Sequence, residues 1–260
     1  MGRAEQAACE GQQVSLLRIE HLCCAFGSLV VTNDLSLVVE EGERHVVIGP
    51  NGAGKTSLIN QIGGQLPSTA GHIHIGEVDI TGRSPEYVAA QGVARTFQRN
   101  NLFFNLTVAE NLRLAVQIKR GSPRNCVTSA QNNARVNERV SELLARVNLD
   151  GRGDRPVRAL SYGEQRQLEI GMALACEPRL LMLDEPTSGM SPAETEQIIS
   201  LIRSLPRSIA VLMIEHDMNV VFSIADRVTV LTSGQVLASG SIDDIKANQR
   251  VREVYLGGAP

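Results

Sequence analysis

Apolar positions along the chain follow two patterns, and each predicts a different kind of strand. Residues 15–24 and 71–75 carry apolar side chains in near alternation, which is typical of strands with one face in solvent. Residues 45–48 and 209–214 form short apolar runs, as does 178–185, which two acids close. Such runs predict strands buried on both faces of a parallel sheet.

Helical segments alternate with these strands. Residues 135–147 show the helical repeat through Val136, Val140, Leu143, Leu144 and Val147. Further helices are expected at 55–62, 85–91, 108–119, 165–175, 191–205 and 251–256. Further strands are expected at 35–39, 43–48, 93–98, 224–231 and 235–238, and polar residues 121–133 predict a loop. The pattern as a whole predicts an α/β fold with a β-rich N-terminal edge.

The composition is that of one globular domain. The chain has 260 residues, 43% of them hydrophobic, which is enough for one α/β domain with an inserted subdomain. The net charge of −3 lacks the basic balance of a nucleic-acid binder, so no nucleic-acid partner is expected. Residues 1–14 are polar, show no secretory signal, and are expected to form a disordered tail.

Cysteines and apolar runs bear on the compartment. The five cysteines are odd in number and show no C-x-x-C spacing, which indicates reduced thiols in the cytosol. They are Cys9, Cys23, Cys24, Cys126 and Cys176. The apolar runs are far shorter than the roughly 20 residues that span a bilayer. Any role at a membrane is therefore expected to come through partner proteins.

Residues 49–56 read Gly-Pro-Asn-Gly-Ala-Gly-Lys-Thr and match the phosphate-loop pattern G-x-x-x-x-G-K-[ST] after a predicted strand. Glycines let backbone N–H groups wrap a triphosphate, because a Cβ inside the loop would block that approach. A triphosphate is therefore the expected ligand, with Lys55 reaching its β and γ oxygens and the Thr56 hydroxyl ligating Mg²⁺. The expected nucleotide-binding residues of this stretch are Gly49, Asn51, Gly52, Gly54, Lys55, Thr56 and Ser57.

Two acids and a histidine follow the later apolar runs. Ligands of a parallel sheet collect at the carboxyl ends of its strands, so we expect these side chains near the phosphate loop. Asp184 is expected to hold Mg²⁺ through water, and Glu185 to accept a proton from the attacking water. His216 is expected to contact the γ-phosphate; the alternative is an ordinary histidine at a strand end.

Three other places allow a structural and a functional interpretation. Gln98, at the end of the predicted strand 93–98, is either an exposed loop residue or a functional amide. Phe26 is either a platform for a nucleobase or a core aromatic. Residues 101–108, with Phe103 and Phe104, form either a docking patch or part of the protein's own core.

A second helix start lies at residues 160–165, Leu-Ser-Tyr-Gly-Glu-Gln. Ser161 alone is a good helix N-cap, and that role requires no ligand. Gly163 just inside the helix also makes a second anion-binding terminus in a chain that already has one. Two phosphate-binding ends require either two ligands or a second copy of the chain.

Taken in order, these motifs resemble the nucleotide-binding subunits of ATP-binding cassette (ABC) transporters, from about residue 16 to residue 257. In that family two cassettes sandwich two ATP molecules, so the phosphate loop of one faces the 160–165 motif of the other. The resemblance implies a P-loop fold with a mixed central sheet, an N-terminal antiparallel β region and an inserted helical subdomain. It divides 15–257 into a RecA-like core, 15–98 and 177–257, and a helical subdomain at about 99–176.

The resemblance also assigns roles at the nucleotide. Phe26 looks like the aromatic that stacks on adenine, although Tyr is commoner there. Gln98 is similar to the residue that senses Mg²⁺ and the membrane subunit. Ser161 and Gly163 are expected to contact the partner's γ-phosphate.

The catalytic set follows from the same resemblance. Asp184 resembles the Walker B acid, Glu185 the catalytic base and His216 the switch histidine. Two positions depart from the family's pattern. Tyr162 replaces a glycine, but the phosphate contact is expected to survive; Ser191 stands where many members have an Asp that links the two sites.

Within the family, residues 189–195, 214–218 and 250–257 are most similar to bacterial branched-chain amino acid uptake ATPases. Urea or short-amide importers share much of this pattern, and a cassette protein outside transport is a further alternative. The resemblance implies two transmembrane permease subunits, a second cassette that is a copy or a paralogue, and, indirectly, a periplasmic solute-binding protein. It implies a peripheral location at the cytoplasmic face of the inner (plasma) membrane.

Overall fold

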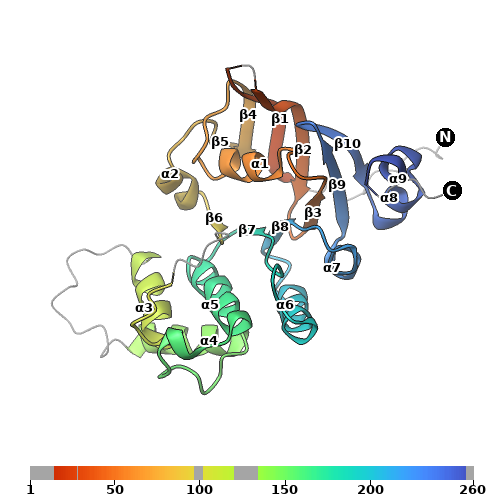
Figure 1. Cartoon of the computed structure of the whole chain (residues 1–260). Helices are drawn as coiled ribbons and strands as arrows, with labels where there is room; N and C mark the ends of the chain where they lie inside the picture. Colours follow the sequence, from red (N-terminus) through yellow and green to blue (C-terminus); the bar gives the residue numbers. More distant parts are fainter. Residues whose placement is uncertain (1–14, 28, 97–101, 120–133, 256–260) are drawn as a thin grey trace, which may run out of the picture.

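The computed structural model describes residues 15–27, 29–96, 102–119 and 134–255. Two β-sheets form its centre (Figure 1). The smaller sheet is antiparallel, in the order β2-β1-β4-β5, with strands β1 (Ser15–Phe26), β2 (Leu29–Glu40), β4 (Ala70–Ile75) and β5 (Val78–Asp79). The larger is parallel except for β10 and has the order β10-β9-β3-β8-β7-β6. Its strands are β3 (Arg44–Ile48), β6 (Val93–Arg95), β7 (Leu180–Asp184), β8 (Ala210–Ile214), β9 (Arg227–Thr232) and β10 (Gln235–Gly240).

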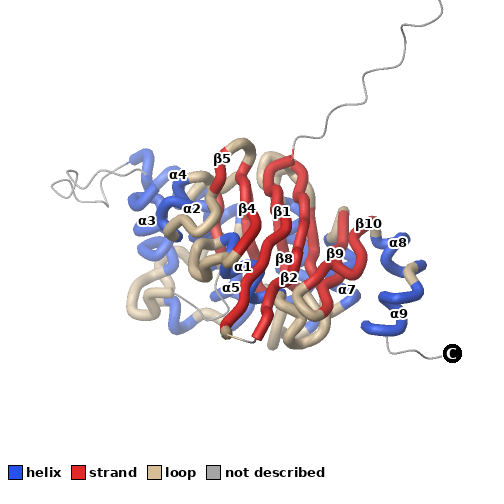
Figure 2. The backbone as a smooth tube through the Cα atoms, turned by 90° about the horizontal axis from the view of Figure 1, so that it is seen from above, coloured by secondary structure: helices blue, strands red, loops and turns tan. Residues whose placement is uncertain are grey.

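Helices cover both faces of the larger sheet. Helix α1 (Lys55–Ile62) lies between the two sheets, whereas α5 (Tyr162–Ala175), α6 (Pro192–Ser204) and α7 (Met218–Ile224) pack on the opposite face (Figure 1). Helices α3 (Val108–Lys119) and α4 (Ala134–Arg146) pack with α5 at one end of the molecule. The short helices α2 (Pro85–Ala90), α8 (Ile242–Ala247) and α9 (Gln249–Tyr255) lie at the two sides, as Figure 2 shows.

The central strands are buried on both faces, as their apolar runs predict. Every residue of β3, β7 and β8 is buried. In β8, Leu212 and Ile214 face the core shared with α1 and the smaller sheet, whereas Val211 and Met213 face the core shared with α3 to α7. The predicted α/β fold with a mixed sheet and an antiparallel β region is therefore confirmed.

Some element boundaries differ from the sequence prediction. The predicted strand 224–231 was placed too early, because Ile224 ends α7, a helix that the pattern did not reveal. Asp217 starts this helix by accepting a hydrogen bond from the backbone N–H of Asn219 at 2.8 Å. Strand β2 begins at Leu29, well before the predicted residue 35, and its additional residues are largely exposed.

Among the described residues, no helix is both long and apolar enough to cross a bilayer. Cys23, Cys24 and Cys176 are free thiols, as predicted, and Cys9 and Cys126 lie outside the described residues.

Candidate active site

Three neighbouring parallel strands end at one edge of the larger sheet, and their ends carry most of the predicted site. Strand β8 lies between β3 and β7, so Ile214 pairs with both Val47 and Asp184. The phosphate loop follows β3, Glu185 follows β7, and His216 lies two residues beyond β8. The sheet topology therefore gathers residues that are far apart in the sequence.

Glycine shapes the phosphate loop. Gly52 and Gly54 have φ angles of +79° and +99°, in the left-handed region that residues with a Cβ avoid. A Cβ at Gly54 would lie 2.5 Å from the carbonyl oxygen of Val31. Helix α1 thus starts after a residue that supplies no side-chain cap, and its first turn contains no acid. Such a terminus is suited to an anion from outside the chain.

Lys55 opens α1 and turns its ammonium group back over the loop. Its Nζ donates to the carbonyl oxygens of Gly49 at 2.7 Å and Pro50 at 3.0 Å. Burial lowers the pKa of Lys55, whereas the charges of Glu185 and Asp184 act in the opposite direction. The lysine therefore lies within electrostatic reach of both acids.

The end of β7 is strained and held in place. Glu185 has a φ of +45°, a conformation that costs a residue with a side chain about 1–3 kcal/mol. Arg166 of α5 donates from Nη2 to the carbonyl oxygen of Asp184 at 2.8 Å. Arg95 of β6 lies with Nη2 3.3 Å from Oδ2 of Asp184. Strain supported by such contacts is typical of a functional site.

His216 projects from the end of β8 beside Glu185. Its Nδ1 lies 3.8 Å from Oε1 of Glu185, and its side chain is 57% exposed. The fully buried Glu215 accepts hydrogen bonds from the His216 backbone N–H at 3.0 Å and from the Thr187 hydroxyl. Glu215 therefore ties the end of β8 to the loop after β7 and fixes the backbone that carries the histidine.

The N-terminus of α5 is capped by the protein's own side chains. The Ser161 hydroxyl accepts from the backbone N–H of Glu164 at 3.2 Å, and the Glu164 carboxylate accepts from the backbone N–H of Ser161 at 2.8 Å. The predicted cap is therefore confirmed. Oε1 of Glu194, from α6, also accepts from the Gly163 N–H at 3.0 Å and the Ser161 hydroxyl at 3.2 Å.

Phe26 lies at the tip of the β1–β2 hairpin, near the phosphate loop. It pairs with Leu29 and is 56% exposed, so the interpretation as a core aromatic is wrong. Val31 of the same hairpin approaches Gly54 closely. The hairpin that carries Phe26 therefore packs against the phosphate loop. Gln98 lies outside the described residues.

Sequence reasoning missed the residues that support the site from a distance, namely Arg95, Arg166, Glu194 and Glu215. Arg166 is 2% exposed, which is unusual for an arginine. A charged residue directly after the apolar pair 93–94 could have drawn attention to Arg95. Glu194 follows Ser191 at the spacing of a capping box, but its contact with α5 spans 31 residues and leaves no local pattern.

The arrangement fits a nucleoside triphosphate and Mg²⁺. It combines a glycine cradle that a Cβ at Gly54 would obstruct, an uncapped helix start and a buried lysine. Thr56 and Asp184 offer the oxygen ligands that Mg²⁺ prefers. Within the described ranges, no group of three or more His, Cys, Asp or Glu side chains could hold a metal unaided.

An apolar groove of about 380 Å³ lies between α2, β6, α3 and α5. Phe103 and Ile118 line it and are 54% and 78% exposed, respectively. Phe104 is also exposed, whereas Leu102 is buried. Exposure of both phenylalanines favours the docking interpretation of residues 101–108 over the core interpretation.

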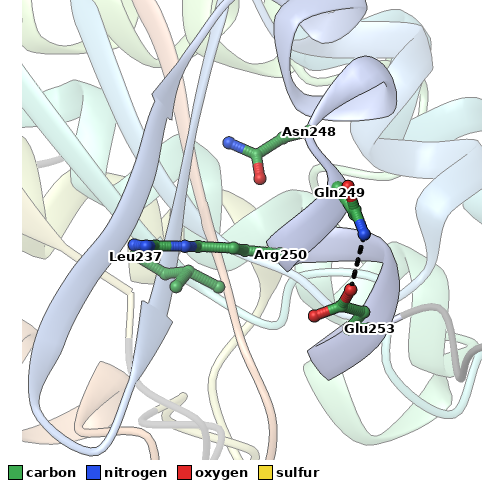
Figure 3. Close-up of a pocket in the computed structure, with 5 residues that line it drawn as sticks. All are labelled: Leu237, Asn248, Gln249, Arg250 and Glu253. Atoms are coloured by element: carbon green, nitrogen blue, oxygen red, sulfur yellow. Dashed lines mark hydrogen bonds between the residues drawn. The ribbon is translucent and has the colours of Figure 1, made fainter.

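A second hollow lies between β10 and α9, beside the edge of the larger sheet (Figure 3). Its lining residues are Leu237, Asn248, Gln249, Arg250 and Glu253, and Gln249 donates from Nε2 to Oε1 of Glu253 at 3.0 Å. None of the predicted site residues lines it, so its chemistry is separate from that of the strand ends.

The phosphate loop, the acids at the end of β7 and the two-sheet architecture define an ATP-binding cassette. A family model described as ABC transporter matches residues 32–188, and one described as branched-chain amino acid ATP-binding cassette transporter matches 235–260. The chain therefore belongs to the ABC transporter family, as one of its ATP-binding, ATP-hydrolysing cassettes. ATP-binding subunits of ABC transporters work with membrane subunits and dimerise, and the solved cassette MJ0796 is described as dimeric in a post-hydrolysis state.

Relatives and solved structures agree with this assignment. The high-affinity branched-chain amino acid transport ATP-binding protein LivG of Salmonella typhimurium is 38% identical over 94% of this chain and 98% of LivG. BraF of Pseudomonas aeruginosa, with the same description, is 37% identical over the same shares. The cassette MJ1267 in its ADP conformation has a TM-score of 0.83 at 30% identity over 94% of this chain and 99% of its own. A nucleotide-free cassette from an ABC transporter has a TM-score of 0.82 at 30% identity, over 94% of this chain and all of its own.

Proposed function

We propose that this chain is the ATP-hydrolysing subunit of a bacterial importer for branched-chain amino acids. The observation that carries the proposal is the joint match of residues 235–260 to the branched-chain family model and of nearly the whole chain to LivG and BraF. The cassette acts at the cytoplasmic face of the inner membrane, bound to two transmembrane permease subunits. A periplasmic solute-binding protein delivers the cargo to those subunits.

Hydrolysis takes place at the strand ends. Lys55 and the backbone N–H groups at the start of α1 bind the β- and γ-phosphates. Glu185 accepts a proton from the water that attacks the γ-phosphorus, and His216, with Nδ1 3.8 Å from this acid, contacts the γ-phosphate. Thr56, Asp184 and Gln98 would hold Mg²⁺, which when bound neutralises phosphate charge.

Two cassettes complete each ATP site. The loop residues Gly49, Asn51, Gly52, Gly54 and Ser57 bind phosphate from one side, and Phe26 stacks on adenine. The start of α5 in the second cassette supplies the Ser161 hydroxyl and the Gly163 N–H from the other side. The second cassette is a copy of this chain or a paralogue. ATP thus acts as the ligand that closes the dimer.

Closure is passed to the membrane through the apolar groove. We propose that residues 15–98 and 177–257 act as the nucleotide-binding core, and residues of about 99–176 as the helical subdomain that turns on closure. A short helix of a permease subunit fits the groove's apolar lining and the exposed Phe103 and Phe104. An exposed apolar groove of this kind argues against a cassette protein outside transport.

The test is uptake of labelled leucine by the native cell carrying Lys55→Ala, compared with the parent. Loss of high-affinity uptake, with the variant present in the membrane fraction at parental level, supports the proposal. Unchanged leucine uptake under the same conditions overturns the amino acid assignment. Labelled urea and a short amide, measured in the same cells, decide whether the alternative importer class then applies.

A further inference from the structure

One carboxylate joins the starts of two helices in this chain. Oε1 of Glu194 accepts from the Gly163 N–H at 3.0 Å and the Ser161 hydroxyl at 3.2 Å, both at the start of α5. Oε2 accepts from the Ser191 N–H at 3.1 Å and the Ser191 hydroxyl at 2.8 Å, at the start of α6. An acid at the third position of a helix needs only its own N-cap. The additional contact with α5 therefore requires a separate explanation.

The two donors of α5 form an anion site that Glu194 fills. Gly163 makes this possible, since a Cβ there would lie 2.8 Å from Cγ of Glu194 and 2.9 Å from Oε1. Hydrogen bonds from the Ser191 side chain, then from the backbone N–H groups of Ser191 and Gly163, lower the pKa of Glu194 to about 2. The carboxylate is therefore ionised at neutral pH and is held by the same donors that a phosphate oxygen would use.

We infer that Glu194 is a positioning residue that occupies, in the separate cassette, the place of the partner cassette's γ-phosphate. This inference rests on the proposed function, which assigns Ser161 and Gly163 to that phosphate. A carboxylate and a phosphate cannot share one set of donors, because both are anions and each needs the same N–H and O–H groups. Dimer closure therefore exchanges one anion for another at the start of α5.

The contact of Glu194 with α5 should have opposite effects on the separate cassette and on the ATP-bound dimer. While Glu194 holds the donors, only a fraction of the cassettes offers a free site, and the apparent affinity for the partner's nucleotide is reduced by that fraction. The same contact keeps the start of α5 ordered before the partner arrives. Removing the charge of Glu194 should thus weaken the separate cassette but strengthen the ATP-bound dimer. A residue that only caps helices would weaken both.

The test measures both quantities in the full-length chain carrying Glu185→Gln, which we expect to bind ATP without hydrolysing it. Sedimentation velocity gives the dimer dissociation constant at saturating ATP, with and without Glu194→Gln. It is measured for the chain alone and mixed with the second cassette of its transporter. With Glu194→Gln we expect the dimer dissociation constant to fall by about fivefold or more. We also expect a lower Tm for the ATP-free variant, and Glu194→Ala should give the same two signs.

Asp244→Asn is the matched control. Asp244 caps α8 through Ser241 in the same way, with backbone and hydroxyl contacts of 2.9 and 2.7 Å, but lies away from α5. It should lower the Tm and leave the dimer constant unchanged. A dimer dissociation constant that is unchanged or larger in both Glu194 variants overturns the inference but leaves the proposed function standing. If Glu185→Gln forms no ATP-dependent dimer with either partner, the proposed two-cassette site fails and the inference falls with it.

Discussion

The starts of α1 and α5 are two helix termini of one chain that are built in opposite ways. Before α1, Gly54 takes a left-handed conformation, no side chain caps the helix, and the first turn contains no acid. Before α5, Ser161 forms a capping box, and Glu194 adds a carboxylate from another helix. The first terminus has a lysine beside it, and the second has two carboxylates.

The difference between the two helix starts suits two different ways of binding an anion. A helix start without a cap leaves its N–H groups to a ligand, which suits a terminus that binds nucleotide in the same chain. A capped start is stable without a ligand, which suits a terminus whose phosphate is provided by another molecule. In the proposed two-cassette site, the second arrangement leads to competition, because the Glu194 carboxylate has to leave before the partner's phosphate can bind.

Removing the cation of the α1 terminus should have the largest effect. Lys55→Ala is expected to lower kcat/KM for ATP hydrolysis by about 10²–10³-fold, since Lys55 lies over the phosphate loop and would offset the negative charge that develops on the phosphate. The measurement is steady-state phosphate release by the assembled transporter. Lys246→Ala, which removes a lysine that lies 4.1 Å over the Phe222 ring, should retain parental activity. If Lys246→Ala lost as much ATPase activity as Lys55→Ala, the special role of the lysine at the start of α1 would be contradicted.

Replacing glycine by alanine should destabilise the protein more at the start of α1 than at the start of α5. Gly54→Ala is expected to lower the free energy of unfolding by about 1–3 kcal/mol, because of its φ of +99° and the Val31 carbonyl at 2.5 Å. Gly163 lies within α5, and the atoms nearest to a Cβ there belong to the flexible Glu194 side chain, which would have to give up its contact with α5. Gly163→Ala should therefore lose that contact but remove the entropic cost of a glycine in a helix, for a net change of less than about 1 kcal/mol. Urea unfolding curves measure both values.

Gly82→Ala is the control for strain without a close contact. Gly82 has a φ of +62°, and nothing lies within 4 Å of the position that a Cβ would take there. It should lose about 1–2 kcal/mol, the expected cost of the left-handed conformation alone. If Gly54→Ala proves no more destabilising than Gly163→Ala, the α1 loop does not depend on glycine in the way described.

The sequence predicted the α1 terminus more completely than the α5 terminus. The phosphate loop is a contiguous pattern after a buried strand, so composition and spacing are enough to identify it. The buried strands β7 and β8 were equally clear from their apolar runs. The Ser161 cap was also predicted, because capping depends on neighbouring residues.

Contacts between distant segments were not predictable in this way. Glu194 reaches α5 across 31 residues, Arg95 reaches Asp184 across 89, and neither pair follows a local period. Helix α7 was missed because its residues 218–224 continue into an apolar strand, and the period of the strand dominated the pattern. Such contacts depend on how strands are ordered in the sheet, which one sequence does not specify.

The smallest expected effect is that of acidic pH on stability. Low pH should remove the stability that Glu194 contributes at the start of α5, whereas the first turn of α1 contains no acid to protonate. The pKa of Glu194 is lowered from 4.5 to about 2 in the folded chain, mainly by Ser191. The unfolded chain therefore binds more protons between these two pH values, and the stability due to this carboxylate is lost as the pH falls through that window. The urea midpoints of the parent and Glu194→Gln should differ by a constant amount from pH 8 to about pH 5.5. The difference should shrink below about pH 4.5 and be mostly lost at about pH 2. Glu196→Gln, on an exposed position of α6, should shift the midpoint little at any pH. A gap between parent and Glu194→Gln that persisted at pH 2 would show that the side chain stabilises α5 by packing, and the contrast with α1 would then not be one of charge.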